Sequence, residues 1–339
     1  MQEKEAMHYR KVKEGIVQCQ LCPWYCVIKE KERGKCGVRE NREGKLYSLV
    51  YARPCAVNVD PIEKKPLYHF LPGSMSYSVG TVGCNLFCHQ CQNYTTSKAK
   101  PEDVLSMKME PNQVVDNAIK SKCQSISYTY NEPTIQYENV YDTAKIAKKE
   151  KIKNVMVTNG YINEKPLKEL YKYIDAANVD LKGFSEKFYK EVCGVRLEPV
   201  LNSLKLIKKM NLWLEITNLV IPGYNDNMKI IKEMCKWIKK NLSTNVPLHF
   251  SRFYPCYEMI DTPITPIETL KKAYETARNE GIKFVYIGNV GAEGGYSDTF
   301  CPKCGERLIK RGSYFGVEYN KIRNGKCFNC KEKIPGVWK

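Results

Sequence analysis

The stretch that decides the fold of this chain is Gly83-Cys84-Asn85-Leu86-Phe87-Cys88-His89-Gln90-Cys91-Gln92-Asn93. Its spacing, Cys-x3-Cys-x2-Cys, offers three thiolates from one short loop, one fewer than the four that usually hold a cubane iron–sulfur cluster. One iron of a 4Fe-4S cluster on Cys84, Cys88 and Cys91 would keep an open coordination position, as catalytic metals do. The alternative is a zinc loop whose fourth ligand lies elsewhere, and His89 is close in sequence.

An open iron at this loop predicts a specific cofactor, S-adenosylmethionine. Its amino and carboxylate groups can chelate the iron, and one electron from the reduced cluster then breaks the sulfonium S–C5′ bond. The product, a 5′-deoxyadenosyl radical, takes a hydrogen atom from an unactivated carbon. This chemistry needs an external electron donor as a partner. The motifs further along the chain favour it over the zinc alternative.

Length and composition indicate a globular protein without a membrane segment. The chain has 339 residues, 43% of them hydrophobic, which suffices for one large domain with appendages or for two domains. The charged N-terminus lacks the apolar region of a signal peptide, and no apolar run approaches the length of a membrane span. We therefore expect a cytoplasmic protein.

The net charge of +17 raises the question of a nucleic-acid partner. Residues 301–339 hold ten basic and three acidic residues, so this short tail carries much of the excess. An RNA-modifying enzyme is therefore one alternative. It is not favoured, because a similar charge balance is common in heat-adapted proteins rich in Lys and Glu.

Eleven of the sixteen cysteines fall into three spaced groups, which favours metal binding over disulfides in a cytoplasmic chain. The N-terminal group, Cys19, Cys22, Cys26 and Cys36, has the count and compactness of a closed four-ligand site. Zinc or a second iron–sulfur cluster would fit it. A structural role and a role in electron relay both remain open.

The C-terminal group pairs two Cys-x2-Cys knuckles, Cys301 with Cys304 and Cys327 with Cys330. This spacing is typical of a zinc ribbon or a rubredoxin-like site. Four thiolates leave no open position, so a zinc or iron ion there would fold the tail and take no part in catalysis. The other five cysteines are interpreted as buried small side chains: Cys55, Cys123, Cys193, Cys235 and Cys256.

The middle of the chain alternates β-branched or aromatic runs with amphipathic stretches, the pattern of βα units around a parallel sheet. We expect an α/β fold, a partial (β/α)6 TIM-like barrel over residues 76–290. Residues 1–75 form a Cys-rich N-terminal extension, and residues 291–339 a linker with a zinc-ribbon-like tail. The predicted strands are Tyr77–Val82, Ser125–Thr129, Asn154–Thr158, Ala177–Leu181, Trp213–Val220, Pro247–Phe253 and Lys283–Ile287. The predicted helices include Thr134–Lys149, Pro199–Met210, Met228–Lys240 and Pro266–Asn279.

Polar residues follow several of these strands, at the end of a barrel where chemistry takes place. Asn131 and Glu132 are placed to accept hydrogen bonds from the amino group of S-adenosylmethionine, unless they merely begin a helix. Asn159 ends the next strand. Asp180 and Lys182 point to the same face of their strand, where they meet the methionine carboxylate or form an ion pair at the barrel mouth.

The fifth predicted strand supplies Glu215, Thr217 and Asn218, which are candidates to hold ribose hydroxyls. The sixth predicted strand contains His249. A lone histidine on a strand is more often a core residue than a catalytic base, so we interpret His249 as a core residue. Arg252 presents a planar fork that suits a carboxylate-bearing substrate.

In this order, the motifs resemble the AmmeMemoRadiSam system radical SAM enzyme family, which is related to the activating enzymes of glycyl-radical enzymes such as pyruvate formate-lyase. The resemblance implies a partial barrel, a 4Fe-4S cluster on the three loop cysteines, bound S-adenosylmethionine, and a protein partner or a small-molecule substrate. The stretches that carry it are Cys19–Cys36, Asp60–Gly73, Cys84–Cys91, Tyr130–Pro133, Asp180–Lys182 and Cys301–Trp338.

The leading hypothesis is an enzyme whose radical takes hydrogen from a substrate, for instance a glycine of a partner protein. A hypothesis from another class is a non-catalytic iron–sulfur or zinc module. That alternative explains the cysteine groups but gives no reason for polar residues at the strand ends.

Overall fold

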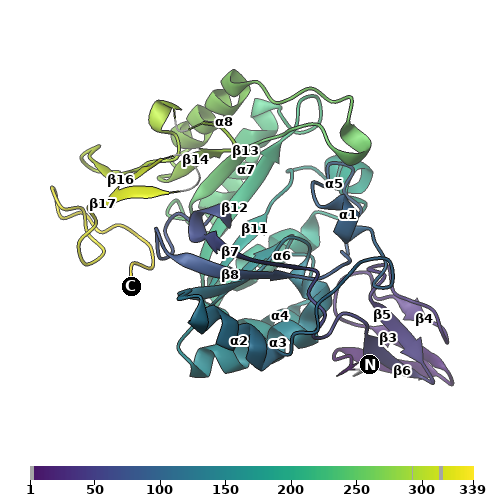
Figure 1. Ribbon diagram of the computed structural model, residues 1–339. Helices are drawn as coiled ribbons and strands as arrows, with labels where there is room; N and C mark the ends of the chain where they lie inside the picture. Colours follow the sequence, from purple (N-terminus) through teal and green to yellow (C-terminus); the bar gives the residue numbers. More distant parts are fainter. Residues whose placement is uncertain (1–3, 292, 313–315) are drawn as a thin grey trace.

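The computed structural model describes residues 4–291, 293–312 and 316–339 (Figure 1). The N-terminal part forms two small antiparallel sheets, with strand orders β1-β6-β5 and β2-β3-β4. The first contains β1 (Lys4–Glu5), β5 (Arg39–Arg42) and β6 (Lys45–Ser48). The second contains β2 (Tyr9–Lys13), β3 (Ile16–Cys19) and β4 (Val27–Ile28).

The centre of the molecule is an eight-stranded sheet in the order β14-β13-β12-β11-β10-β9-β8-β7. Seven strands, β8 to β14, follow one another in parallel, and β7 pairs antiparallel with β8. Because β7 and β14 are the two edges, the sheet is an open barrel, as predicted. The strands are β7 (Ala56–Pro61), β8 (Met75–Gly80), β9 (Ser125–Tyr128), β10 (Lys153–Thr158), β11 (Ala176–Asp180), β12 (Trp213–Val220), β13 (Leu248–Arg252) and β14 (Val285–Gly288).

Helices connect the parallel strands and cover the outer face of the sheet (Figure 1). Their apolar residues recur at helical spacing: α7 buries Ile231, Met234, Cys235 and Ile238. The helices are α1 (Tyr94–Ser97), α2 (Pro111–Lys120), α3 (Tyr137–Lys149), α4 (Glu164–Leu170), α5 (Glu186–Cys193), α6 (Glu198–Lys209), α7 (Met228–Asn241) and α8 (Ile267–Asn279). Single 3-10 turns are η1 (Ile62–Lys64), η2 (Pro133–Gln136), η3 (Tyr171–Tyr173), η4 (Tyr257–Met259) and η5 (Glu293–Gly295). No described helix is both long and apolar enough to cross a bilayer.

Residues 61–74, which we call the floor segment, differ from the sequence-based expectation of an extended connection. The segment runs inside the barrel, where Asn178 donates to the Pro66 carbonyl at 2.8 Å. The backbone amides of Tyr68 and His69 donate to the buried Glu215 carboxylate at 3.0 and 2.8 Å. Together with β7, the floor segment therefore belongs to the barrel, although we assigned both to the N-terminal extension.

The C-terminal tail forms a three-stranded sheet of β15 (Thr299–Phe300), β16 (Arg307–Arg311) and β17 (Val317–Asn320). It docks on the floor segment: Val337 exchanges backbone hydrogen bonds with His69 and Leu71, each at 2.7 Å. The tail and the N-terminal sheets lie at opposite ends of the barrel (Figure 1). Ala292, in the predicted linker to the tail, lies outside the described residues.

Candidate functional site

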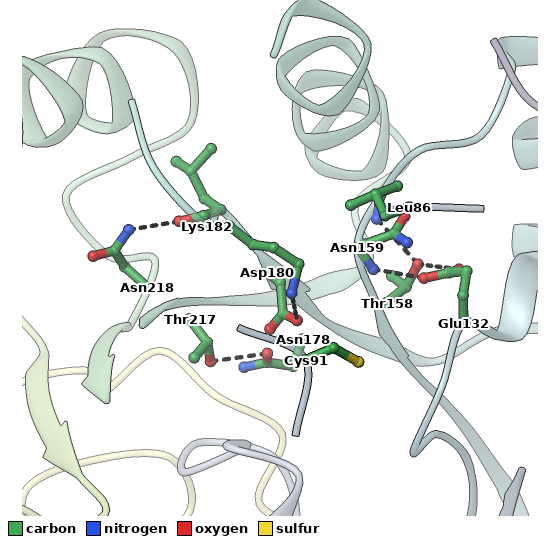
Figure 2. Close-up of polar contacts among 12 residues, drawn as sticks. Leu86, Cys91, Glu132, Thr158, Asn159, Asn178, Asp180, Lys182, Thr217 and Asn218 are labelled. Carbon is green, nitrogen blue, oxygen red and sulfur yellow. Dashed lines mark hydrogen bonds and ion pairs between the residues drawn. The ribbon is translucent and has the colours of Figure 1, made fainter. Parts of the chain in front are cut away.

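A cavity of about 390 Å³ opens at the carboxyl ends of the parallel strands. The thiols of Cys84, Cys88 and Cys91 line one side of it. We call residues 83–93 the cysteine loop. The opposite side is polar and comes from residues that follow β9, β10 and β11, as Figure 2 shows for part of the wall. This is the end of a barrel at which enzymes of this architecture carry their chemistry.

Hydrogen bonds hold the cysteine loop in place. The Phe87 and His89 amides donate to carbonyls at the end of α5, at 2.9 and 3.0 Å. The Leu86 amide donates to the Cys84 sulfur at 3.4 Å, and the Cys91 sulfur lies 3.1 Å from the Ser97 hydroxyl. Donors aimed at sulfur stabilise thiolates, so the loop suits metal ligation.

Two of the loop thiols differ in their readiness to ionise. Burial raises the pKa of Cys84, and the nearby Glu132 carboxylate raises it further. A hydrogen bond from Cys193 lowers the pKa of Cys88 to about 7, against the effect of burial. Binding of a cluster would therefore release the Cys84 proton, because only thiolates ligate iron. Cys193, interpreted from sequence as a buried side chain, is buried and also contacts a predicted ligand.

His89, the candidate fourth ligand of a zinc loop, lies 3.5 Å from Glu258 on the surface. Among the described residues, the only group of His, Cys, Asp and Glu side chains close enough for one metal ion is the C-terminal one. The zinc interpretation of the cysteine loop therefore has no geometric support.

Glu132 organises the wall of the cavity next to Cys84. It accepts hydrogen bonds from the Thr158 hydroxyl and the Asn159 amide, each at 2.7 Å, and from the Thr134 amide at 2.9 Å (Figure 2). Burial raises its pKa, and these donors lower it in part. Asn159 in turn points its side-chain amide at the Cys84 sulfur, 3.8 Å away. Glu132 thus positions Asn159 beside the loop.

The residue before Asn131 has an uncommon backbone conformation. Tyr130 adopts φ of 71°, a left-handed conformation that bulky residues rarely take. Its hydroxyl donates to Asp60 at 2.8 Å, and its carbonyl accepts from Asn93 of the cysteine loop. The turn directs Asn131 into the cavity wall, where its amide donates to the Thr81 carbonyl at 2.6 Å.

Asp180 and Lys182 face the cavity and form an ion pair of 2.8 Å (Figure 2). Burial disfavours the lysine charge, but Asp180 and the Cys88 sulfur outweigh burial and raise the pKa of Lys182. Lys182 is therefore a cation beside the cysteine loop. Whether this pair contacts a cofactor stays a prediction.

The three residues on β12 that we predicted to hold ribose hydroxyls lie in three different environments. Thr217 lines the cavity and donates to Asn178 at 2.9 Å. Asn218 points away and donates to the Leu181 carbonyl at 2.7 Å, because neighbouring strand residues face opposite sides (Figure 2). Glu215 lies deeper in the barrel, where the floor segment occupies its carboxylate. Neither Glu215 nor Asn218 lines the cavity, so we no longer expect either to hold a ribose.

Two further candidates on β13 also lie away from the cavity. His249 bonds to Glu215 at 2.7 Å and is buried, as expected of a core histidine. Arg252 donates to the Thr265 carbonyl at 2.8 Å and stacks on Tyr254. Conversely, Lys64 and Lys65 line the cavity, although sequence reasoning missed them. Their only local signal is a pair of lysines inside a proline-bounded segment, which resembles a linker.

The four C-terminal thiols converge on one point. Their sulfur atoms all lie within 4.8 Å of one another. The pairs Cys301 with Cys330 and Cys304 with Cys327 are separated by 3.5 and 3.8 Å. These separations suit one tetrahedral metal ion with four thiolate ligands.

Comparisons with known proteins agree with this architecture. Residues 78–238 match the Radical SAM superfamily. The uncharacterized protein MJ0808 of Methanocaldococcus jannaschii is 47% identical over 336 residues, covering 98% of this chain and 99% of that protein. The SuiB structure from Streptococcus suis with bound S-adenosylmethionine aligns at 16% identity and a TM-score of 0.50, covering 67% of this chain and 53% of SuiB. At that identity the structural likeness concerns the fold alone.

Two activating enzymes are similar over part of their length. The 4-hydroxyphenylacetate decarboxylase activating enzyme of Clostridium scatologenes is 27% identical over 119 residues, 34% of this chain and 38% of that enzyme. The pyruvate formate-lyase 1-activating enzyme of Escherichia coli K12 is 24% identical over 144 residues, 42% of this chain and 58% of that enzyme. The superfamily match begins in β8 and ends in α7, so it includes the cysteine loop and most of the cavity wall. This chain therefore belongs to the radical SAM superfamily and is a distant homologue of the activating enzymes of glycyl-radical enzymes.

Proposed function

We propose that this protein cleaves S-adenosylmethionine reductively and uses the resulting radical to take hydrogen from a glycine of a partner protein. The observation that carries the proposal is the placement of three thiols, and no fourth among the residues that the structure describes, on the wall of the cavity. The partial similarity to two activating enzymes supports a protein substrate. The sequence motifs support the AmmeMemoRadiSam branch of the superfamily.

Cys84, Cys88 and Cys91 would hold the 4Fe-4S cluster. When bound, this cluster supplies one electron to S-adenosylmethionine, which yields methionine and a 5′-deoxyadenosyl radical. The polar wall suits the zwitterionic end of the cofactor. Lys182 is a half-buried cation for its carboxylate, while Asp180 and the side-chain oxygen of Asn131 can accept from its amino group.

Residues of the wall also keep one another in place before any ligand enters. Thr96 donates to the Asn131 oxygen at 3.0 Å, and Asn159 donates to Asn85 of the cysteine loop at 2.9 Å. A wall ordered in this way lowers the entropy lost when a flexible cofactor binds. The same bonds tie the strand ends to the loop that carries the thiols.

The basic tail gives little support to the RNA alternative. Four of its cations are already paired, Arg307 with Asp298, Lys310 with Glu318, Lys321 with Glu306, and Arg311 with Glu63. The tail also docks on the floor segment, away from the cysteine loop. These ion pairs leave fewer of the tail's cations free to bind an RNA backbone.

The test is anaerobic reconstitution with iron and sulfide, followed by dithionite, S-adenosylmethionine and chromatography for 5′-deoxyadenosine. The comparison is with a variant carrying Cys84→Ala, Cys88→Ala and Cys91→Ala, and with the matched control Cys235→Ala, which removes a buried thiol of α7. We expect the nucleoside from the wild type and the control alone. A wild type that assembles the cluster on the cysteine loop but yields no nucleoside would refute the proposal in favour of a non-catalytic module.

A further inference from the structure

The N-terminal cysteines form a second group of sulfur atoms outside the cavity. Cys19 ends β3, and its amide donates to the Cys26 carbonyl across the hairpin at 2.9 Å. The Cys22 thiol is close enough to Cys19, Cys26 and Cys36 to interact electrostatically with each of them. The fold therefore gathers four thiols that lie up to 17 positions apart in the sequence.

Two of these four sulfurs accept a hydrogen bond from a nitrogen. The backbone amide of Lys35 donates to the Cys26 sulfur at 3.4 Å. The Arg39 guanidinium donates to the Cys19 sulfur at 3.4 Å. N–H donors directed at sulfur are expected around metal-bound thiolates.

Arg39 provides the second indication of a bound anionic group. Its side chain is 1% exposed, and its Nε atom is buried without a hydrogen-bond partner. The guanidinium reaches Glu138 of α3 at 2.6 Å on its other side. Glu138 balances the charge of this cation, but a buried donor without an acceptor is unfavourable. Metal-bound thiolates are acceptors of hydrogen bonds from N–H groups.

The spacing of the sulfurs distinguishes a cluster from a single ion. Sulfurs bound to one zinc lie within about 4.6 Å of one another, twice the Zn–S bond of about 2.3 Å. Among the described residues, the C-terminal thiols converge within 4.8 Å of one another, as for a single ion, whereas the N-terminal group and the cysteine loop do not converge in this way. We propose that Cys19, Cys22, Cys26 and Cys36 hold a second iron–sulfur cluster, closed by four thiolates and therefore unable to bind S-adenosylmethionine.

This second cluster would lie directly behind the cysteine loop. A Cβ atom on Gly83 would stand 2.9 Å from the Cys36 carbonyl and 2.6 Å from Val38, so only glycine permits the approach. The Trp24 indole donates to the Asn85 carbonyl at 2.8 Å. A low-potential one-electron protein donor can thus reduce the N-terminal cluster, which then passes that electron to the group on Cys84, Cys88 and Cys91. The electron-transfer role of the N-terminal cluster rests on the proposed function. The presence of a metal site on these four cysteines does not.

The metal site is tested in the variant that lacks all three loop cysteines, because its N-terminal group is intact. After anaerobic reconstitution we expect about four iron and about four sulfide ions per chain, apart from the ion of the tail. Dithionite should produce the electron paramagnetic resonance signal of a reduced cluster, and S-adenosylmethionine should leave that signal unchanged. The wild type should hold about twice as much sulfide.

Zinc without sulfide in that variant would overturn the proposal in favour of a structural ion. A variant with Cys19→Ala and Cys22→Ala added should lose the remaining sulfide, whereas the loop variant carrying Cys235→Ala should keep it. Persistence of sulfide in the first of these would also overturn the site. Since none of these readouts depends on turnover, they remain informative if the proposed function fails.

The relay is tested by the rate at which the loop cluster is reduced in the otherwise wild-type chain. With reduced flavodoxin as the donor, Cys19→Ala with Cys22→Ala should slow this reduction at least tenfold, measured by freeze-quench paramagnetic resonance. Dithionite, a small reductant that diffuses into the cavity, should reduce it at the wild-type rate. Equal rates with flavodoxin in the two proteins would overturn the relay.

Discussion

Three thiols of the cysteine loop face a cavity, whereas the four thiols of the C-terminal tail face one another. Both groups use the same ligand atom and similar short spacings. The loop cysteines lie beside Asn159 and Lys182 on the wall of the cavity, which leaves room for a ligand. The tail sulfurs leave no such room. Ligand number and spacing, more than ligand type, thus separate a site suited to chemistry from one suited to folding.

The largest expected effect is a loss of catalytic activity without a loss of protein stability. Cys88→Ala should reduce 5′-deoxyadenosine formation below detection, because two thiols cannot hold the cluster. The melting temperature of the metal-free protein should change by less than about 5 °C, as for one small buried side chain. Chromatography and calorimetry on the same preparation check both parts. Retained turnover would show that Cys88 is not a ligand.

Substitution of cysteines in the tail should have the opposite result, a loss of folded structure in the tail. Cys301→Ser with Cys327→Ser removes two ligands of the closed site, so the tail should lose a large part of the ~10 kcal/mol that structural zinc supplies to small domains. Proteolysis within residues 301–339, together with metal analysis, measures this loss. The matched control is Cys256→Ser, outside the tail. A tail that stays resistant without metal would contradict the comparison.

A third prediction concerns the contact between tail and barrel. Arg311 donates to the Tyr68 carbonyl at 2.7 Å and lies 3.8 Å from the buried Glu63. Arg311→Met leaves that carboxylate without its cation and should lower the free energy of unfolding by about 3–5 kcal/mol. Arg307→Met, on the exposed side of the same strand, should cost less than about 1 kcal/mol. Urea denaturation measures the free energy of unfolding of both variants. Equal losses of stability in Arg311→Met and Arg307→Met would contradict the prediction.

The smallest predicted effect is a pH dependence at the same contact. Burial lowers the pKa of His69 to about 4, and its ring accepts from the Tyr286 hydroxyl at 2.5 Å. Between pH 6.5 and 4 the unfolded chain binds a proton that the folded chain refuses, so stability falls as pH falls. The loss attributable to His69 should be on the order of 3 kcal/mol.

Urea denaturation of the wild type and His69→Gln at pH 7 and pH 4 measures this loss. The variant should lose less stability on acidification, because glutamine does not titrate. Burial raises the pKa of Glu63 to about 6, which acts in the opposite direction in both proteins and cancels in the comparison. If the wild type and His69→Gln lose the same stability between pH 7 and pH 4, the loss comes from groups other than His69.

Much of the barrel could be predicted from local patterns. Runs of buried β-branched residues place the parallel strands within two residues of their observed bounds, and the amphipathic stretches match α6, α7 and α8 closely. The cysteine spacing identified the loop because all its ligands lie in one short segment. These strands, helices and loop ligands are set by residues close together in sequence, so the spacing of residues along the chain is enough to predict them.

The floor segment could not be predicted in this way. Its three prolines and one glycine are typical of a linker, and its structure depends on partners far away in sequence, above all Glu215. The same long-range contacts explain the error at Glu215, whose strand position is compatible with a cavity residue. Only the three-dimensional structure shows that backbone amides of the floor segment had already taken its oxygens.

The pairing of Phe70 with Val337 also bears on how the chain is made. These residues leave the ribosome more than 260 positions apart, so the barrel emerges and begins to collapse before its lower end is covered. Until β16 of the tail is synthesised, the buried carboxylate of Glu63 lacks its ion-pair partner Arg311. A nascent chain stalled before residue 300 should therefore depend on chaperones, because the tail that covers the floor segment has not yet been synthesised.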